Sequence, residues 1–242
     1  MGSKNRIFNN MMPIILKDRK INQYYIEPFV GGCNSIDKVD GLRIGSDKNK
    51  YIFEMWKGLQ ENKERPCTID KKLYDEARTE FNNGTNNKFD DFTIGWIGWM
   101  ASYNGRFFDG GYAGNYLKRD YIDEQIRNTE SQIDNIKDII FHNKSYEELD
   151  IPNNSIIYCD IPYKGTKQYI ASKNFNYDNF WEWCRNKTTE GHSVFISEYN
   201  APLDFECVWE KQVTNSMNTS ITYKPIEKLF VYKNSIDDFW NS

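Results

Sequence analysis

The chain has 242 residues, which is enough for one ordinary domain with an insertion or for two small domains. Its net charge of -4 excludes a strongly basic protein but leaves room for a local basic groove that holds nucleic acid. The five cysteines form no CxxC pattern, the two histidines have no ligand spacing and no apolar run reaches the roughly 20 residues that span a bilayer, so we expect a soluble cytoplasmic protein without a metal site.

Residues 1–60 contain an expected helix followed by two strand-and-turn patterns. The opening segment predicts a helix from about residue 5, with Pro13 expected to kink or divide it. The stretch "YYIEPFVGG" predicts a strand that runs into a glycine turn, and "GLRIGSDKNKYIFEMWKGLQ" predicts a second strand, an acid and a helix. Two such units in succession favour a parallel sheet.

Residues 55–135 are expected to be mostly helical, with aromatic, glycine-rich loops. The glycines and aromatic residues of "DFTIGWIGWMASYNGRFFDGGYAGNY" would make a poor core strand, so we expect a recognition loop there. The stretch "DYIDEQIRNTESQIDNI" predicts a helix with isoleucines near helical spacing, and we interpret its acids as a solvated face.

Strand patterns return after the helical segment, in "KDIIFHN", "SIIYCD", "HSVFIS", "FECVWEKQV" and "EKLFVYK". An aromatic stretch between the second and third of these, "NFNYDNFWEWCRNKTTEG", predicts a helix. The sequence therefore indicates a parallel α/β sheet interrupted by a helical insertion of about eighty residues. We place the sheet domain in residues 1–54 and 136–242 and the inserted domain in residues 55–135.

Acids or acid-bearing loops follow three of the predicted strands, in "EPFVGG", at Asp47 and at Asp160, where ligands bind in open α/β sheets. In "SIIYCDIPYKGT" a buried strand ends in Asp160, and Pro162 and Tyr163 follow, which is typical of an active-site lip or of an ordinary Asx-Pro turn. Asp47 could accept hydrogen bonds from ribose hydroxyls or cap a helix. The stretch "FVGGCNS" lets the backbone approach a ligand closely, or forms a tight turn.

The motifs "YIEPFVGG", "SDKN" and "CDIPYKGTKQY", in this order, resemble those of the Dam-like D12 class of DNA adenine-N6 methyltransferases, many of them encoded by phages. The resemblance covers nearly the whole chain, including "MGSKNRI", "VFISEYNAP" and "EKLFVYK". It implies a Rossmann-like methyltransferase sheet that uses S-adenosylmethionine (AdoMet), with residues 55–135 as the target-recognition domain. Adenine in double-stranded DNA would be the methyl acceptor, with no metal and no obligate protein partner.

The resemblance also implies roles for particular residues. Asp160 and the backbone carbonyl of Ile161 would accept hydrogen bonds from the target amine, beside Pro162, and Tyr163 would stack on the flipped base, unless it is a core aromatic. Asp47 would hold the ribose hydroxyls of the cofactor. The other cofactor-binding residues implied are Gly2, Ser3, Lys4, Glu27, Pro28, Phe29, Gly31, Gly32, Asn143, Ser145 and Asp160.

Three departures from the family pattern stand out. Ile161 replaces a proline, which removes a fixed φ but keeps the carbonyl. Ser145 stands where relatives often carry an acid, and no aromatic residue precedes Gly2. Because of Ile161, a catalytically silent DNA- or AdoMet-binding relative is an alternative, and a methyltransferase acting on RNA is another.

The predicted DNA contacts are basic and amide side chains on two segments. Those beside the catalytic motif suit phosphates, and those in the inserted segment suit base edges, although each could be an ordinary solvated surface residue. They are Lys164, Lys167 and Lys173, and Asn104, Arg106, Lys118 and Arg119. Restriction-modification, the self-protection of a phage genome and the regulation of expression are all compatible biological roles.

Overall fold

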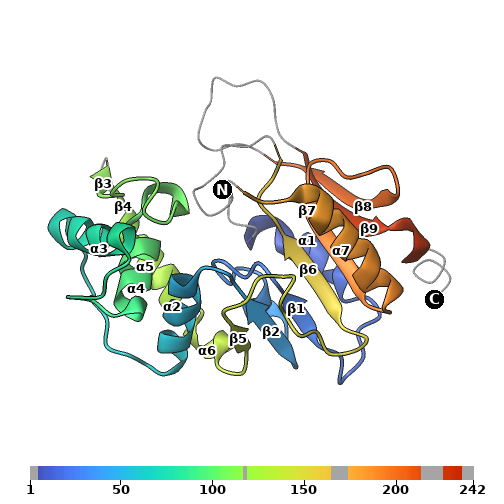
Figure 1. The fold of residues 1–242 in the computed structure, drawn as a ribbon, viewed down its shortest axis with the longest axis horizontal. Helices are drawn as coiled ribbons and strands as arrows, with labels where there is room; N and C mark the ends of the chain where they lie inside the picture. Colours follow the sequence, from blue (N-terminus) through green and yellow to red (C-terminus); the bar gives the residue numbers. More distant parts are fainter. Residues whose placement is uncertain (1–4, 117–118, 165–173, 214–225, 236–242) are drawn as a thin grey trace.

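The computed structural model describes residues 5–116, 119–164, 174–213 and 226–235, and it joins a seven-stranded sheet to a helical unit (Figure 1). The strand order is β5-β2-β1-β6-β7-β9-β8. The strands are β1 (Tyr25–Glu27), β2 (Arg43–Ser46), β5 (Ile140–His142), β6 (Ile156–Asp160), β7 (Ser193–Glu198), β8 (Phe205–Gln212) and β9 (Ile226–Tyr232). The strands stand where the sequence predicts them, and the α/β fold is Rossmann-like, as expected.

The sheet is mixed, which corrects the expectation of a purely parallel one. Strands β5, β2, β1, β6 and β7 are parallel, whereas β9 lies antiparallel between β7 and β8. An apolar run reads the same in either direction, so the residue pattern of β9 predicts a strand without predicting how it pairs.

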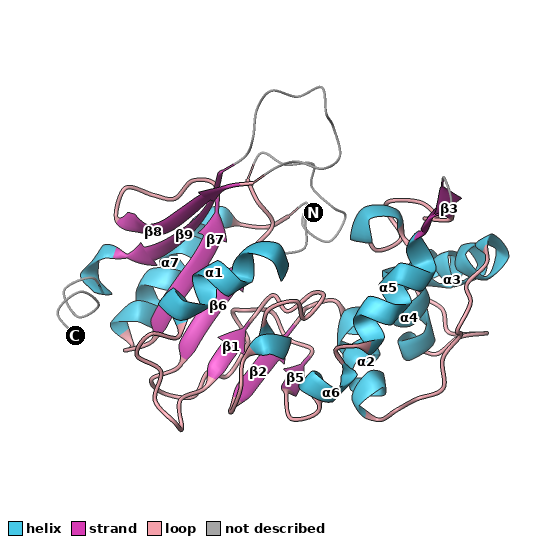
Figure 2. Ribbon diagram, turned by 180° about the vertical axis from the view of Figure 1, so that it is seen from behind, coloured by secondary structure: helices cyan, strands magenta, loops and turns pink. Residues whose placement is uncertain are grey.

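Helices α1 (Asn5–Ile15) and α7 (Tyr177–Thr189) cover opposite faces of the sheet (Figures 1 and 2). Successive residues of a strand point to opposite faces, and the two core clusters follow this alternation. Tyr158 lies in the cluster with Phe8 of α1, whereas Ile157 and Cys159 lie in the cluster with Phe180 of α7. Helix α1 runs through Pro13, and the helix expected in residues 174–191 is α7.

The helical unit lies beside the β5 edge of the sheet (Figure 1). It comprises α2 (Lys50–Gln60), α3 (Lys71–Asn83), α4 (Asp91–Ala101), α5 (Tyr121–Glu130), α6 (Ile133–Ile136) and the small hairpin of β3 (Asn115–Tyr116) and β4 (Arg119–Asp120). Asn49, Asp70, Asp90 and Asp120 each cap a helix by accepting backbone N–H groups. Helix α2 runs without a break through the predicted boundary between residues 54 and 55.

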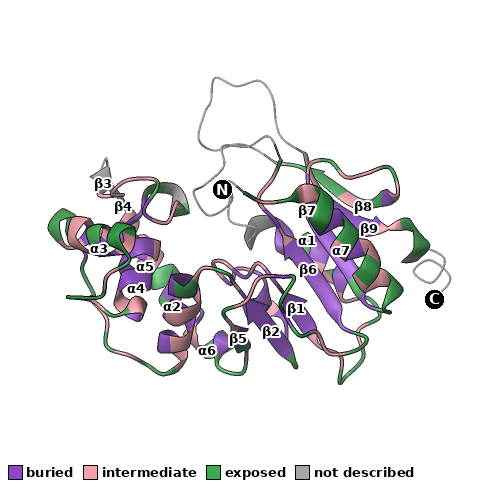
Figure 3. Ribbon diagram, viewed as in Figure 1, coloured by how far each residue is buried: buried purple, intermediate pink, exposed green. Residues whose placement is uncertain are grey.

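The prediction of an exposed recognition loop in residues 91–116 is wrong, because the first half of this stretch is the buried helix α4 (Figure 3). Trp96 is fully buried, and a Cβ at Gly95 would lie 2.1 Å from the carbonyl oxygen of Tyr51 in α2. A Cβ at Gly98 would lie 2.6 Å from the ring of Phe108. The glycines therefore allow close helix packing, and the aromatic residues build the core of the helical unit.

The helix expected over residues 120–136 is divided into α5 and α6, with Ser131 and Gln132 at the break. Within the described ranges, every helix is too short or too polar to cross a lipid bilayer.

Candidate active site

The carboxyl ends of β1, β2 and β6 lie side by side along one end of the sheet, which we call the sheet edge. The site lies where the strand order reverses, between β1 and β6. In the parallel register, Glu27 lies beside Gly45 of β2, and Asp160 at the end of β6 lies beside Ser197 of β7. Loops that leave neighbouring parallel strands in opposite directions open a crevice for ligands. The sequence-predicted acids Glu27, Asp47 and Asp160 are therefore gathered at this edge.

Glu27 ends β1 and is only 3% exposed. The Tyr25 hydroxyl donates to its Oε1 at 2.8 Å, and Ser35 forms a second side-chain hydrogen bond. Burial, together with the charges of Asp160 and Asp37, raises the pKa of Glu27 to about 8, even though the hydrogen bonds from Ser35 and Tyr25 lower it. The carboxyl is therefore mostly protonated at pH 7.

The glycine turn after β1 is tied to Asp47 at the end of β2. Gly31 has a φ of +44°, which favours glycine, and its N–H donates to Asp47 Oδ2 at 3.2 Å. The Asn49 N–H donates to Asp47 Oδ1 at 2.9 Å, and Asn49 itself caps α2, so Asp47 is not the helix cap. Burial raises the pKa of Asp47, and the two backbone hydrogen bonds lower it.

These residues fit an adenosyl cofactor. An ionised carboxylate has about four acceptor sites, so Asp47 retains acceptor capacity for ribose hydroxyls beyond its two backbone bonds. The Cβ position of Gly31 has no atom within 4 Å, which leaves room for a ligand beside the loop. The side-chain amide of Asn143 donates to the Asp47 carbonyl at 2.9 Å and so fixes the next loop against the site.

Phe29 and Ser145 have local partners. The Phe29 ring lies 5.4 Å from that of Tyr146 and 5.8 Å from that of Phe180, so it packs in the aromatic cluster on the α7 side of the sheet. The Ser145 hydroxyl donates to Glu148 Oε2 at 3.1 Å, within its own loop. Their predicted contacts with the cofactor remain predictions, as does that of Pro28.

The predicted catalytic motif follows β6 directly. Ile161 is 1% exposed and packs in the core cluster of Ile157 and Phe180, so its side chain serves packing. Pro162 accepts a hydrogen bond on its carbonyl from the Tyr177 hydroxyl at 2.8 Å. These contacts hold the backbone after Asp160 on a rigid support.

Tyr163 is half-buried and held from two sides. Its hydroxyl donates to Glu227 Oε2 at 2.7 Å, and its ring meets that of Tyr199 edge-to-face at 4.6 Å between centroids. Burial raises the pKa of the Tyr163 phenol well above its usual value, with the charges of Asp160 and Glu227 adding to the shift. The phenol is therefore a neutral donor.

Glu198 and Glu227 are site residues that the sequence analysis missed. Glu198, at the end of β7, is 2% exposed, and its carboxylate accepts the Lys164 N–H at 2.8 Å and the Tyr199 N–H at 2.6 Å. It thereby fixes the residue that follows the catalytic motif. An acid at the end of the strand in "VFISEY" is the same signal that identified Asp160, whereas Glu227 lies within a strand and carries no such signal.

The described candidate DNA contacts lie in two places. Arg119 makes a bidentate ion pair with Glu124 in the helical unit, at 2.6 and 2.7 Å, and Arg106 is half-buried in the same unit. The exposed ammonium of Lys164 lies 5.7 Å from the ring centroid of Tyr177, at the sheet edge. The side chain of Asn104 lies outside the described part of the structure. The other predicted DNA contacts, Lys118, Lys167 and Lys173, and the predicted cofactor-binding residues Gly2, Ser3 and Lys4 lie entirely outside it.

The solved structures that are similar to this chain share little of its sequence. No curated protein matches the sequence. Among solved structures, the chain is similar to the rRNA methyltransferase AviRa from Streptomyces viridochromogenes, with 7% identity and a TM-score of 0.43 over 97% of this chain and 86% of that one. It is also similar to "SMU.472, a putative methyltransferase complexed with SAH", with 10% identity and a TM-score of 0.42 over 95% of this chain and 52% of that one.

The comparison that decides the family covers most of the sequence. The family model of the D12 class N6 adenine-specific DNA methyltransferases matches residues 1–206. These residues contain the glycine turn, Asp47 and the motif that begins at Asp160. The chain therefore belongs to the D12 class of N6 adenine-specific DNA methyltransferases.

Proposed function

We propose that this chain methylates N6 of an adenine that is flipped out of double-stranded DNA at a specific sequence, with AdoMet as methyl donor. The observation that carries the proposal is the catalytic loop from Asp160 to Tyr163, which leaves β6 next to Glu27 and is held by Glu198 and Glu227. The helical unit in residues 55–135 would recognise the target sequence.

The loop has the groups that this chemistry needs. The lone pair of an exocyclic adenine amine is delocalised into the ring, so the nitrogen is a poor nucleophile. Asp160 and the carbonyl of Ile161 would accept hydrogen bonds from the amine, which favours a nitrogen with an available lone pair. Because the role of Ile161 belongs to its backbone and its side chain is buried, replacement of proline here is compatible with activity.

Tyr163 would stack on the extruded base. Extrusion from the duplex costs a few kcal/mol, and an aromatic face offsets part of that cost. The hydrogen bond to Glu227 and the edge contact with Tyr199 hold the ring, which reduces the entropy lost when a base packs against it.

Asp47 and the glycine turn would hold AdoMet, with Asp47 accepting hydrogen bonds from the ribose hydroxyls. When bound, AdoMet supplies an electrophilic methyl group. Asp160 carries the one carboxylate of the motif, so it would receive the proton that the amine loses on methylation.

The test is methyl transfer from labelled AdoMet to unmethylated duplex DNA, followed by digestion and identification of the labelled nucleoside. We expect label in N6-methyladenine and a loss of about 10²- to 10³-fold in kcat for Asp160→Ala, as for removal of a preorganised group at a reaction centre. Asp75→Ala, at an exposed ion pair on α3, is the matched control and should retain activity.

Two outcomes would contradict the proposal. Label in RNA but not in DNA would change the acceptor. Binding of AdoMet without transfer to any nucleic acid would indicate a silent relative.

Tyr163→Phe should retain most of the activity because the ring remains, whereas Tyr163→Ala should lose about 10- to 100-fold in kcat/KM for DNA, since base stacking on an aromatic ring contributes about 1–3 kcal/mol.

A further inference from the structure

The glycine turn after β1 is held along its outer side by the helical unit. Trp56 of α2 donates from Nε1 to the Gly31 carbonyl at 2.7 Å. The ring of Trp99 in α4 packs so closely on Gly32 that a Cβ there would lie 2.6 Å from it. Gln132, at the break between α5 and α6, donates from Nε2 to the carbonyls of Gly32 at 3.2 Å and Cys33 at 3.1 Å.

The turn needs such support because its backbone is strained. Gly31 has a φ of +44°, and Cys33, which is not glycine, has a φ of +51°. A residue other than glycine stays in this left-handed conformation only where its surroundings hold it. The carbonyl of Cys33 is one of the groups that Gln132 binds, so the contact acts on the strained residue itself.

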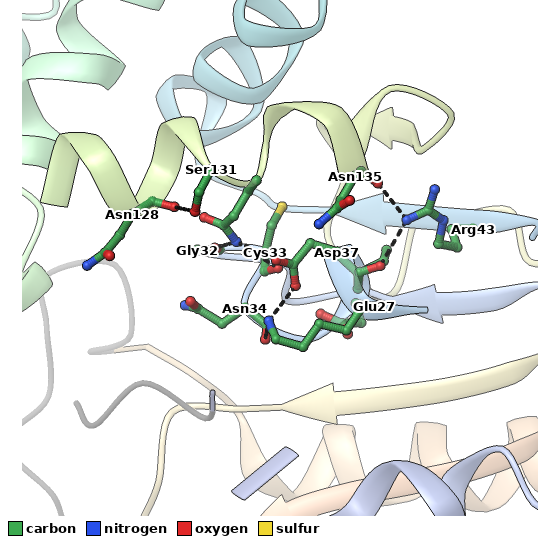
Figure 4. Close-up of polar contacts among 12 residues, drawn as sticks. Glu27, Gly32, Cys33, Asn34, Asp37, Arg43, Asn128, Ser131 and Asn135 are labelled. Atoms are coloured by element: carbon green, nitrogen blue, oxygen red, sulfur yellow. Dashed lines mark hydrogen bonds and ion pairs between the residues drawn. The ribbon is translucent and has the colours of Figure 1, made fainter. Parts of the chain in front are cut away.

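Gln132 also connects the turn to a buried acid. Its Nε2 lies 3.1 Å from Asp37 Oδ2, and Lys38 donates to the other oxygen of Asp37 at 2.8 Å and to the Asn34 carbonyl at 2.6 Å. Figure 4 shows Gly32, Cys33 and Asp37 beside Ser131, at the end of α5. Asp37 in turn adds to the negative potential at Glu27, so the contact borders the site itself.

We propose that Gln132 is a positioning residue by which the helical unit holds the glycine turn in its cofactor-binding shape, so that this unit sets the affinity for AdoMet. This inference rests on the proposed function, because it takes the turn as the AdoMet site. The helical unit is then a structural part of the cofactor site as well as the proposed reader of DNA.

The experiment measures binding of S-adenosylhomocysteine (SAH), the demethylated product of AdoMet, by calorimetry on the full chain. Gln132→Ala should weaken binding about 5- to 20-fold. It should raise the KM for AdoMet by a similar factor, with kcat at saturating AdoMet and the KM for DNA within about two-fold of wild type. Gln132→Glu, which keeps the size but removes the donors and faces Asp37, should weaken binding more.

Gln60 provides the matched control. Its Nε2 donates to the carbonyls of Ile136 at 2.7 Å and Ile139 at 2.8 Å, which is the same kind of amide clamp made to carbonyls outside the glycine turn. Gln60→Ala should lower the unfolding temperature by an amount similar to Gln132→Ala while leaving SAH affinity within two-fold.

The possible failures are distinguishable. If wild type binds SAH and methylates DNA, but folded Gln132→Ala binds SAH as tightly as wild type, the inference is wrong and the proposed function stands. An equal loss of affinity in Gln60→Ala would also overturn it, since the effect would then follow stability alone. If wild type binds no SAH, the proposed function itself fails.

Discussion

The acids of the sheet edge and the ion-paired surface acids of the helical unit are used in opposite ways. At the edge, Asp47 and Glu198 accept backbone N–H groups of the loops around the site, and Glu27 is buried against Tyr25. In the helical unit, acids such as Asp75, Asp123 and Glu124 lie on the surface and pair with lysine or arginine. Exposed ion pairs contribute little to stability because solvent and salt screen them.

The difference shows where the sequence is free to vary. A buried carboxylate that satisfies two backbone donors fixes a loop, and its replacement leaves those donors without acceptors. A surface pair can be exchanged with little effect on the fold. The edge is therefore built to hold one arrangement, whereas the charged surface of the helical unit can change without loss of the fold.

Glu80 gives the sharpest way to break this comparison, because it is an edge-type acid placed in the helical unit. It is 9% exposed, and its two oxygens accept the Lys88 N–H at 2.7 Å and the Phe89 N–H at 3.1 Å. We expect Glu80→Ala and Glu198→Ala each to lower the free energy of unfolding by about 2–4 kcal/mol, since each loses two hydrogen bonds to a charged group.

Activity should separate the two variants. Glu198→Ala releases Lys164, next to the catalytic motif, and a misplacement of about 1 Å can cost about 10²-fold in rate, so we expect kcat/KM to fall about 100-fold. Glu80→Ala should stay within two-fold of wild type. The measurements are urea unfolding and steady-state kinetics on both variants at a temperature where both are folded. Equal losses of activity would show that the edge acids act through stability alone.

The sequence predicts much of this edge, and the reason is local. Apolar runs that end in acids predict β1, β2 and β6, and with them Glu27, Asp47 and Asp160, because neighbouring residues determine where a strand runs and ends. Neighbouring residues do not predict the contacts that the helical unit makes with the glycine turn. Gln132 and Cys33 are 99 residues apart, and no local pattern relates them.

The glycines illustrate the same limit. Gly31 and Gly32 are readable as a turn, because they follow a strand directly. Gly95 and Gly98 lie in a helix, where each serves to admit a neighbour from another part of the chain. A glycine that gives flexibility and one that permits close packing look identical until the neighbour is known, which is why the buried helix α4 was expected to be a loop.

The pH dependence of stability tests the burial of Glu27. Its folded-state pKa is raised from 4.5 to about 8, so the stability that it contributes is fully present below pH 4.5 and is lost as the pH rises through 8. Relative to Glu27→Gln, which does not titrate, wild type should lose up to about 1.4 kcal/mol of unfolding free energy per pH unit in this window. Urea unfolding of both proteins from pH 5 to 9 measures the difference.

This difference isolates Glu27 because other shifted groups, such as Asp47 and His192, titrate in both proteins and cancel. We expect the difference to level off above about pH 9. A difference that does not change with pH would mean that the Glu27 carboxyl is ionised at neutral pH in the folded protein, and that this edge acid behaves like those of the helical surface.

The smallest expected effect concerns Arg119 and Glu124, the bidentate surface pair that joins β4 to α5. Replacing either residue should leave the fold unchanged. If Arg119 reaches DNA, Glu124→Gln removes a competitor for its guanidinium and a repulsive charge, and DNA affinity should rise about two- to four-fold. Arg119→Ala should weaken binding and reduce the slope of log affinity against log salt by about one, the value for one lost phosphate contact.

Lys71 and Asp75, an exposed i,i+4 pair on α3, form the control. Asp75→Asn changes the net charge as Glu124→Gln does, so it corrects for the long-range effect of removing one acid. Fluorescence anisotropy with a labelled duplex at several salt concentrations gives affinity and slope together. If Asp75→Asn and Glu124→Gln raise the affinity equally, Arg119 makes no local contact with DNA, and its predicted role is wrong.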